Sequence, residues 1–232
     1  MPSLDDLRKR ITSVKSTQKI TKAMKMVAAA KMRKAQERME QARPYSNSLS
    51  EIIEHLLPDV DRDSLTLLQV REIKRKAYVV VSADRGLAGA FNTNLLKIAQ
   101  REIDEFGREN VDIFCIGKKA RDHFNYRNYN VIDSHIEFWA EMEFENAMMI
   151  GRSVIDHFTN GSVDEIHVVY NYFTNIAQQE VKSETLLPLS YGTSELTTSD
   201  RLYEPSKDEL VEALIPRHLN VQMWKYLLES YA

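Results

Sequence analysis

Apolar side chains recur at helical spacing through the first 57 residues. Between Ser3 and Arg43 there is neither glycine nor proline, and one seam of positions repeats at alternating intervals of three and four residues, as in a heptad pattern. The seam is apolar at both ends and polar in the middle, and it consists of Leu4, Leu7, Ile11, Val14, Gln18, Thr21, Lys25, Ala28, Met32, Ala35, Met39 and Ala42. A single helix over the stretch from Ser3 to Arg43 would be about 62 Å long, at about 1.5 Å per residue. We therefore expect much of it to project from the body of the protein.

The ends of this helix carry recognisable signals. Ser3 precedes Asp5 and Asp6, so we expect its side chain to cap the first turn, where the acids also favour the helix dipole. Pro44 predicts a kink, after which a helical spacing continues to Pro58.

From Ala77 onward, short β-branched runs alternate with helical patterns. The sequence predicts strands at 77–82, 111–117, 130–133, 164–173 and 179–189, and helices at 93–106, 118–125 and 143–158. The last two strands are expected to be neighbours. Such alternation predicts an α/β fold with a mainly parallel sheet covered by helices.

A last helix is predicted to begin after Pro205. Ser206 and Glu209 match a capping box, and apolar positions continue at helical spacing to Tyr231. We therefore divide the chain into an N-terminal basic coiled-coil helix (1–57), a linker (58–76), an α/β domain (77–205) and the start of a C-terminal helix (206–232).

Charge is unevenly distributed along the chain. The formal net charge is −3, yet residues 1–43 hold 12 Lys and Arg against four acids. The stretch Ile11–Gln36 contains no carboxylate, so several cations are like-charge neighbours at helical spacing, which costs about 0.2–0.5 kcal/mol per pair. This arrangement indicates a negatively charged partner. DNA, a membrane surface and an acidic protein surface are the alternatives, and the last fits best because no aromatic residue lies before Tyr45 to stack on bases or anchor in lipid.

Other chemistry finds little support. The turn "SADRGLAG" (82–89) follows a strand and opens a helix, where nucleotide sites occur, but Gly86 and Gly89 match no complete phosphate-binding motif; a tight turn that requires glycine is the favoured interpretation. The single cysteine, Cys115, lies in an apolar run and is expected to be a buried thiol. The six histidines show no metal-ligand spacing. We expect no catalytic centre, no metal and no cofactor.

Two stretches resemble the gamma subunit of F-type ATP synthase: "TQKITKAMKMVAAAKMRKAQ" (17–36) and "SADRGLAGAFNTNL" (82–95). The similarity continues through "YNYFTNIAQQEVKSETLLPL" and "YEPSKDEL". It implies a non-catalytic rotor shaft, present in one copy per complex, with a Rossmann-like α/β domain at its foot. Implied partners are the alpha and beta subunits of the catalytic head, epsilon, with delta as a further candidate, and the c-subunit ring, but no nucleic acid. The implied location is peripheral, on the cytoplasmic side of the bacterial inner membrane. A nucleotide-dependent α/β enzyme and a DNA-binding protein remain as alternatives.

The resemblance also assigns roles to individual residues. Contact with the catalytic ring is implied for Lys15, Lys19, Lys22, Met24, Lys25, Met26, Lys31, Arg33, Asp84, Arg85, Gly86 and Leu87. Contact with the foot, the c ring and epsilon is implied for Tyr203, Glu204 and Pro205. Lys25 stands where many relatives have an acid, so no specific ion pair is carried over to it. Members of the family continue beyond the point matching Ala232 with a long second helix of the coiled coil. We therefore expect the C-terminal helix of this sequence to be truncated, which leaves the N-terminal seam without its partner helix.

Overall fold

A computed structural model describes residues 3–57, 65–86, 88–175, 178–189 and 207–231. Its order of helices and strands agrees with the predicted alternation. The elements are α1 (Leu4–Leu56), β1 (Lys76–Val81), α2 (Phe91–Phe106), β2 (Val111–Ile116), α3 (Lys118–Tyr126), β3 (Val131–His135), α4 (Phe144–Thr159), β4 (Glu165–Asn175), β5 (Gln178–Leu187) and α5 (Lys207–Tyr231). Short 3₁₀ turns lie at Thr66–Leu68, Arg108–Asn110 and Trp139–Glu141.

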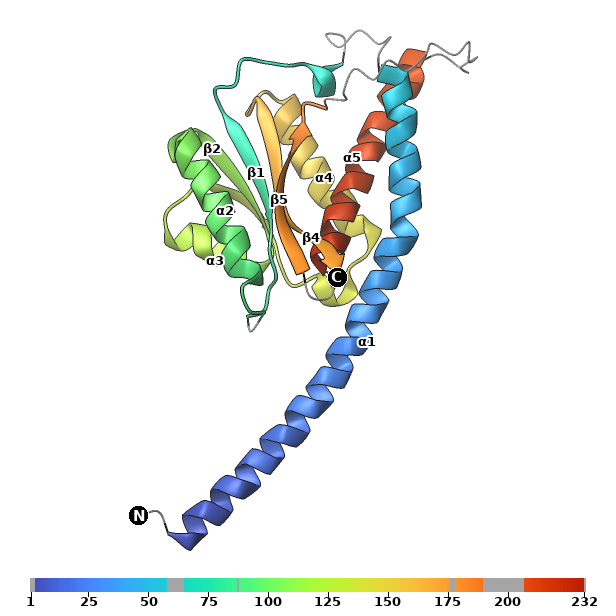
Figure 1. Cartoon of the computed structure of the whole chain (residues 1–232). Coiled ribbons are helices and arrows are strands. Elements are labelled where there is room, and N and C mark those ends of the chain that lie inside the picture. The colour runs from blue at the N-terminus through green and yellow to red at the C-terminus, as the bar shows by residue number, and fades with distance from the viewer. Residues whose placement is uncertain (1–2, 58–64, 87, 176–177, 190–206, 232) are drawn as a thin grey trace.

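Helix α1 is one unbroken helix of 53 residues. Its predicted cap is confirmed, because the Ser3 hydroxyl accepts a hydrogen bond from the Asp6 amide while the Asp6 carboxylate accepts one from the Ser3 amide. The helix continues through Pro44, although proline removes one backbone hydrogen bond. Met39 is buried before the proline and Leu49 and Ile53 after it, so packing against the body supports the helix on both sides of Pro44. Figure 1 shows α1 curving gently and extending well beyond the body.

The sheet has five strands in the order β3-β2-β1-β4-β5. Strands β1, β2, β3 and β4 are parallel to one another, and β5 pairs antiparallel with β4. This confirms the prediction of a mainly parallel sheet whose last two strands are neighbours. The alternation with helices produces it, because a parallel connection has to cross over the sheet.

Helices cover both faces of the sheet (Figure 1). Helices α2 and α3 pack on one face, and α4, α5 and the upper part of α1 lie on the other. In β1 the side chains alternate between the two cores: Tyr78 and Val80 face α2 and α3, whereas Val79 and Val81 join the larger core with α1 and α5. Leu68, in the predicted linker, also joins this larger core.

Cys115 belongs to β2, and its side chain is fully buried in the smaller core, as predicted. Burial raises the pKa of its thiol to about 12, so the thiolate does not form at neutral pH. The predicted capping box at Ser206 lies outside the described residues.

Candidate functional site

The projecting half of α1, from Leu4 to Lys34, is exposed over almost its whole length. Along it, Lys15, Lys19, Lys22, Lys25 and Lys31 are all exposed, and none of these lysines forms an ion pair with a described residue. Arg33 differs, because its Nε lies 3.1 Å from Oε1 of Glu37, one helical turn on. The projecting helix therefore presents a row of cations that the described part of the chain leaves unneutralised.

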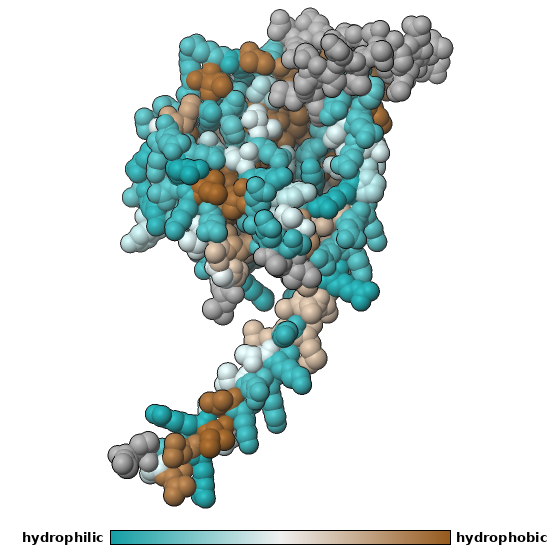
Figure 2. Space-filling view, viewed as in Figure 1, coloured by the Kyte–Doolittle hydropathy of each residue, from teal (hydrophilic) through white to brown (hydrophobic). Residues whose placement is uncertain are grey.

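The same helix exposes apolar side chains that would ordinarily be buried. Leu4, Leu7, Ile11 and Val14 lie toward its free end, and Ile20, Met24, Met26 and Val27 follow. In Figure 2, brown apolar atoms gather near the tip of the helix, while teal side chains line much of the rest. Exposed apolar surface on this scale is typical of a contact with another protein or another helix. Cationic and apolar side chains together indicate a binding surface for a partner that is acidic in part.

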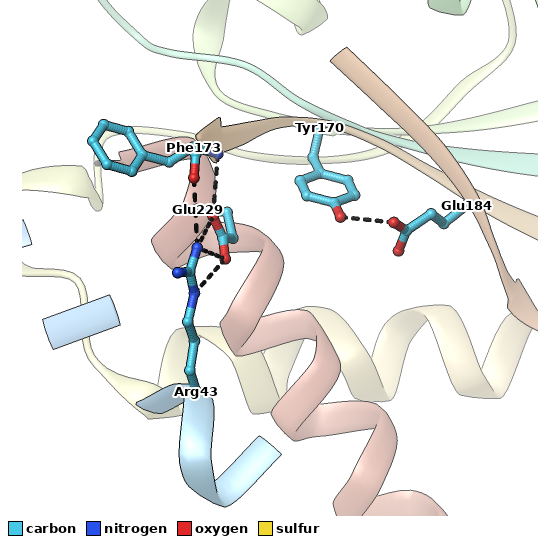
Figure 3. Close-up of polar contacts among 5 residues, drawn as sticks. All are labelled: Arg43, Tyr170, Phe173, Glu184 and Glu229. Atoms are coloured by element: carbon cyan, nitrogen blue, oxygen red, sulfur yellow. Dashed lines mark hydrogen bonds and ion pairs between the residues drawn. The ribbon is translucent and has the colours of Figure 1, made fainter. Parts of the chain in front are cut away.

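A part-buried polar contact links α1 to the body near the point where the helix begins to project. Arg43 donates from Nε and Nη2 to Oε1 of Glu229 in α5, at 3.2 and 2.9 Å. Glu229 Oε2 accepts a hydrogen bond from the Phe173 amide at 3.1 Å, and Arg43 Nη2 also reaches the Phe173 carbonyl at 3.5 Å. Figure 3 shows the three groups converging from α1, α5 and the end of β4. We name this set the Arg43–Glu229 joint.

The turn after β1 is tied to the start of α3. Ser82 Oγ accepts from the Ala120 amide, the Ala83 carbonyl from the Lys119 amide and Asp84 Oδ1 from the Lys118 amide, at 2.8, 3.1 and 2.8 Å. These three amides are those of the first turn of α3, the position at which a helix would hold a phosphate. Since the turn itself occupies them, these three amides of α3 are not available to a phosphate; the helix that the turn opens is α2, which begins at Phe91.

Asp84 has a second role in this turn, because its Oδ2 accepts a hydrogen bond from the Glu137 amide at 2.7 Å. Arg85 and Gly86 are exposed, and Leu87 lies outside the described residues. The need for glycine is confirmed at Gly89, whose φ of +55° favours glycine. The need for glycine is wrong at Gly86, which has no positive φ and where an added β-carbon would make only an ordinary contact, 3.7 Å from the flexible end of the Lys119 side chain. Figure 1 shows this turn at the end of the body from which α1 projects.

Two polar clusters were missed by the sequence interpretation. The first is the Arg43–Glu229 joint, for which the only signal was an acid within the apolar stretch "YLLESY" (226–231). The second surrounds Asp112, which is buried and accepts hydrogen bonds from Arg75 and Asn130, with His157 Nε2 also 2.7 Å from its carboxylate. Charge-assisted bonds of this kind position elements relative to one another.

Three further predicted contact residues, Tyr203, Glu204 and Pro205, lie outside the described residues. Within the described part of the chain, no group of His, Cys, Asp and Glu has the arrangement of a metal site. The described helices also include none that is both long and apolar enough to cross a membrane.

Comparison with known proteins places this architecture in context. A family model described as ATP synthase matches residues 3–232. The ATP synthase gamma chain of Chloroherpeton thalassium is 41% identical over 250 aligned residues, which cover 100% of this chain and 82% of the relative. The gamma chain of Flavobacterium psychrophilum is also 41% identical, over 235 residues with the same coverage.

Solved structures agree in fold at lower sequence identity. A chain from the central stalk and c-ring of the mitochondrial ATP synthase of Tetrahymena thermophila superposes with a TM-score of 0.71 at 21% identity, covering 91% of this chain and 92% of that one. A chain of the rotor of the Euglena gracilis mitochondrial enzyme gives 0.59 at 21% identity, covering 96% and 83%. The full-length sequence matches, supported by the shared fold, establish that this chain belongs to the ATP synthase gamma chain family.

Proposed function

We propose that this chain is the non-catalytic central-stalk rotor subunit of an F-type ATP synthase. It couples ion flow through a membrane c ring to ATP synthesis or hydrolysis in the alpha–beta head. The observation that carries the proposal is the projecting half of α1, which leaves both its lysines and its apolar side chains exposed in a chain that matches gamma chains over its full length.

The exposed lysines suit a partner that turns past them. Lys15, Lys19, Lys22, Lys25 and Lys31 are spread along the helix, and Met24 and Met26 provide flexible apolar contacts beside them. An exposed ion pair contributes only about 0–1 kcal/mol. A shaft held by many weak contacts meets acidic surfaces of the ring at each angle without a deep minimum at any one of them.

The remaining proposed contacts rest on the resemblance to the gamma subunits of the family. Arg33, Asp84, Arg85, Gly86 and Leu87 would face the catalytic ring. Tyr203, Glu204 and Pro205 would face the c ring and epsilon. The alpha and beta subunits, epsilon, delta as a further candidate, and the c ring are the proposed partners, with one copy of this chain per complex. The proposed location is peripheral, on the cytoplasmic side of the bacterial inner membrane.

Native mass spectrometry with an alpha–beta ring tests the proposal directly. We expect one copy of this chain per ring at low salt and a smaller bound fraction at moderate salt, because exposed charges are screened. ATP hydrolysis by the complex should then rise relative to the ring alone. Absence of a complex at low salt, with a gamma chain from a relative binding the same ring, would contradict the proposal.

A further inference from the structure

The site at which α1 leaves the body has to fix the angle of the projecting helix. Most of the contact between α1 and the body is apolar, and Met39, Leu49, Ile53 and Leu56 all belong to the larger core. Burial of apolar surface resists separation of two helices, but it is not directional. By itself it opposes rotation of one helix past another only through the interlocking of side chains.

That interlocking is incomplete at the level of Arg43. A cavity of about 290 Å³ lies between α1, α4 and α5, and its walls include Met39, Arg43, Ser46, Phe144, Trp224 and Lys225. Side chains that line this open pocket lack protein neighbours on that side. Apolar packing at this level therefore leaves part of the surface of α1 without interlocking side chains.

The Arg43–Glu229 joint lies beside this cavity and is directional. The guanidinium donates through two nitrogens to one carboxylate, and the same carboxylate binds the Phe173 amide. The Glu229 side chain is completely buried, with 0% exposure, whereas that of Arg43 retains 35%. Bonds in this fork geometry hold their partners in one relative orientation.

An ion pair with one fully buried partner is a poor source of net stability, because the cost of removing the Glu229 carboxylate and part of the Arg43 guanidinium from water offsets their attraction. Its retention among apolar residues calls for another role. Arg43 lies on α1, Glu229 on α5 and Phe173 on β4, so the joint links the helix to two separate elements of the body. Any twist of α1 relative to the sheet has to break or bend these bonds.

We propose that Arg43 and Glu229 are the positioning residues that fix the rotational angle between the projecting helix and the α/β body. This inference rests on the proposed rotor function for its consequence, since torque applied to the body reaches the helix through this joint. Other polar contacts near the exit are longer: Arg38 reaches the Met142 carbonyl at 3.4 Å, and the Arg43 guanidinium lies 5.8 Å from the Tyr172 ring. Farther along α1, Gln222 Nε2 on α5 donates to Ser50 Oγ at 3.1 Å, but this is a single bond between neutral groups. Among these contacts, several bonds converge on one charged group at the joint alone.

Pulsed dipolar electron paramagnetic resonance on the full chain tests the angle. Spin labels enter at Lys31→Cys on the projecting helix and Arg152→Cys on α4, both exposed, while the buried native Cys115 stays unlabelled. The key variant combines Arg43→Met with Glu229→Gln, which removes both charges together and keeps an acceptor for the Phe173 amide. We expect its distance distribution to broaden relative to the parent while its melting temperature stays close to that of the parent.

Leu49→Ala is the matched control, because it removes apolar packing of α1 near the joint and no polar bond. It should lower the melting temperature without broadening the distribution. Should the double variant not fold, Arg43→Lys keeps the charge but loses the fork, and the same broadening is expected. An unchanged distribution in the folded joint variants, or equal broadening in Leu49→Ala, would overturn the proposal.

The consequence for coupling is measured separately, in the reconstituted complex. There we expect the double variant to hydrolyse ATP but to pump fewer ions per ATP than the parent. A broadened distribution with unchanged pumping would overturn the role in torque. Failure of the parent chain to join the ring would instead contradict the rotor function itself, and the spectroscopic result on the isolated chain would still decide whether the joint sets the angle.

Discussion

Gly117 lies so close to Ser82 that no side chain fits between them. A β-carbon added at Gly117 would lie 2.1 Å from the Ser82 carbonyl oxygen and 2.9 Å from its hydroxyl oxygen. Gly117 also has a φ of +88°, in the region that favours glycine. This contact closes the ends of β1 and β2 together and allows the Ser82 hydroxyl to reach the first turn of α3.

Substitution of Gly117 is therefore expected to be costly. We expect Gly117→Ala to lower the free energy of unfolding by about 3 kcal/mol or more, because it adds a backbone clash to an unfavourable φ. Gly161→Ala is the matched control: its φ is +73°, but an added β-carbon meets nothing within 4 Å. It should cost only about 1–2 kcal/mol. Urea unfolding of both variants makes the comparison, and equal losses would show that the contact with Ser82 is unimportant.

Much of this fold was predictable from local pattern. The runs at β1 and β2 are β-branched and apolar because both faces of these strands are buried. The spacing of apolar positions predicted the N-terminal helix, and the lack of carboxylates in Ile11–Gln36 predicted its cationic surface. Strand β3 was predicted too short: it extends to His135. Asp133 has low strand propensity. At this end of β3, which lies at the edge of the sheet, hydrogen bonding to β2 extends the strand beyond what the local sequence favours.

The polar joints could not be predicted in the same way. Arg43 and Glu229 are 186 residues apart in the sequence, and only the packing of α5 against α1 brings them together. The same holds for Asp112 and His157, which meet because α4 ends over the start of β2. A pattern of apolar positions predicts which faces of helices and strands are buried. It does not predict which single polar groups pair, because that depends on how distant elements pack against one another.

The Asp84 carboxylate is expected to stabilise the turn after β1, because it accepts hydrogen bonds from the Lys118 and Glu137 amides. Asp84→Asn replaces one acceptor oxygen by a donor facing an amide, so we expect a loss of about 1–3 kcal/mol in the free energy of unfolding. Hydrogen exchange at the Lys118 and Glu137 amides should become faster. Arg85→Ala, which changes an exposed neighbour, should leave both exchange rates unaltered. Unchanged exchange in Asp84→Asn would contradict this role.

His218 is expected to make stability depend on pH. It is buried in α5, and burial, together with the nearby positive charge of Lys225, lowers the pKa of its imidazole to about 4. The unfolded chain therefore binds a proton near pH 6.5, where the folded chain does not. The contribution of His218 to the free energy of unfolding is therefore fully present above about pH 6.5. It is lost as the pH drops toward 4, which lowers that free energy by up to about 3 kcal/mol.

The difference between parent and His218→Gln isolates this contribution. The pKa values of Asp164 and Glu165 are also lowered by hydrogen bonds and nearby cations, but their contributions are lost below about pH 4.5. Urea unfolding between pH 4.5 and 7 should show a shallower pH dependence in His218→Gln than in the parent. Identical slopes in the parent and His218→Gln would count against the lowered pKa.

The lysines of the projecting helix are expected to act collectively. Each exposed ion pair contributes about 0–1 kcal/mol, so a single Lys→Ala change at Lys15, Lys19, Lys22, Lys25 or Lys31 should weaken binding to the alpha–beta ring by no more than about fivefold and leave ATP-driven pumping intact. Lys19→Glu with Lys22→Glu should weaken binding far more and reduce its dependence on salt, because two attractive charges become repulsive. Lys97→Glu with Arg152→Glu changes the net charge equally on exposed positions of α2 and α4, and it should have little effect. A single Lys→Ala change that abolished coupling while assembly stayed intact would show instead that one specific ion pair drives the interaction, and the model of many weak contacts would then be wrong.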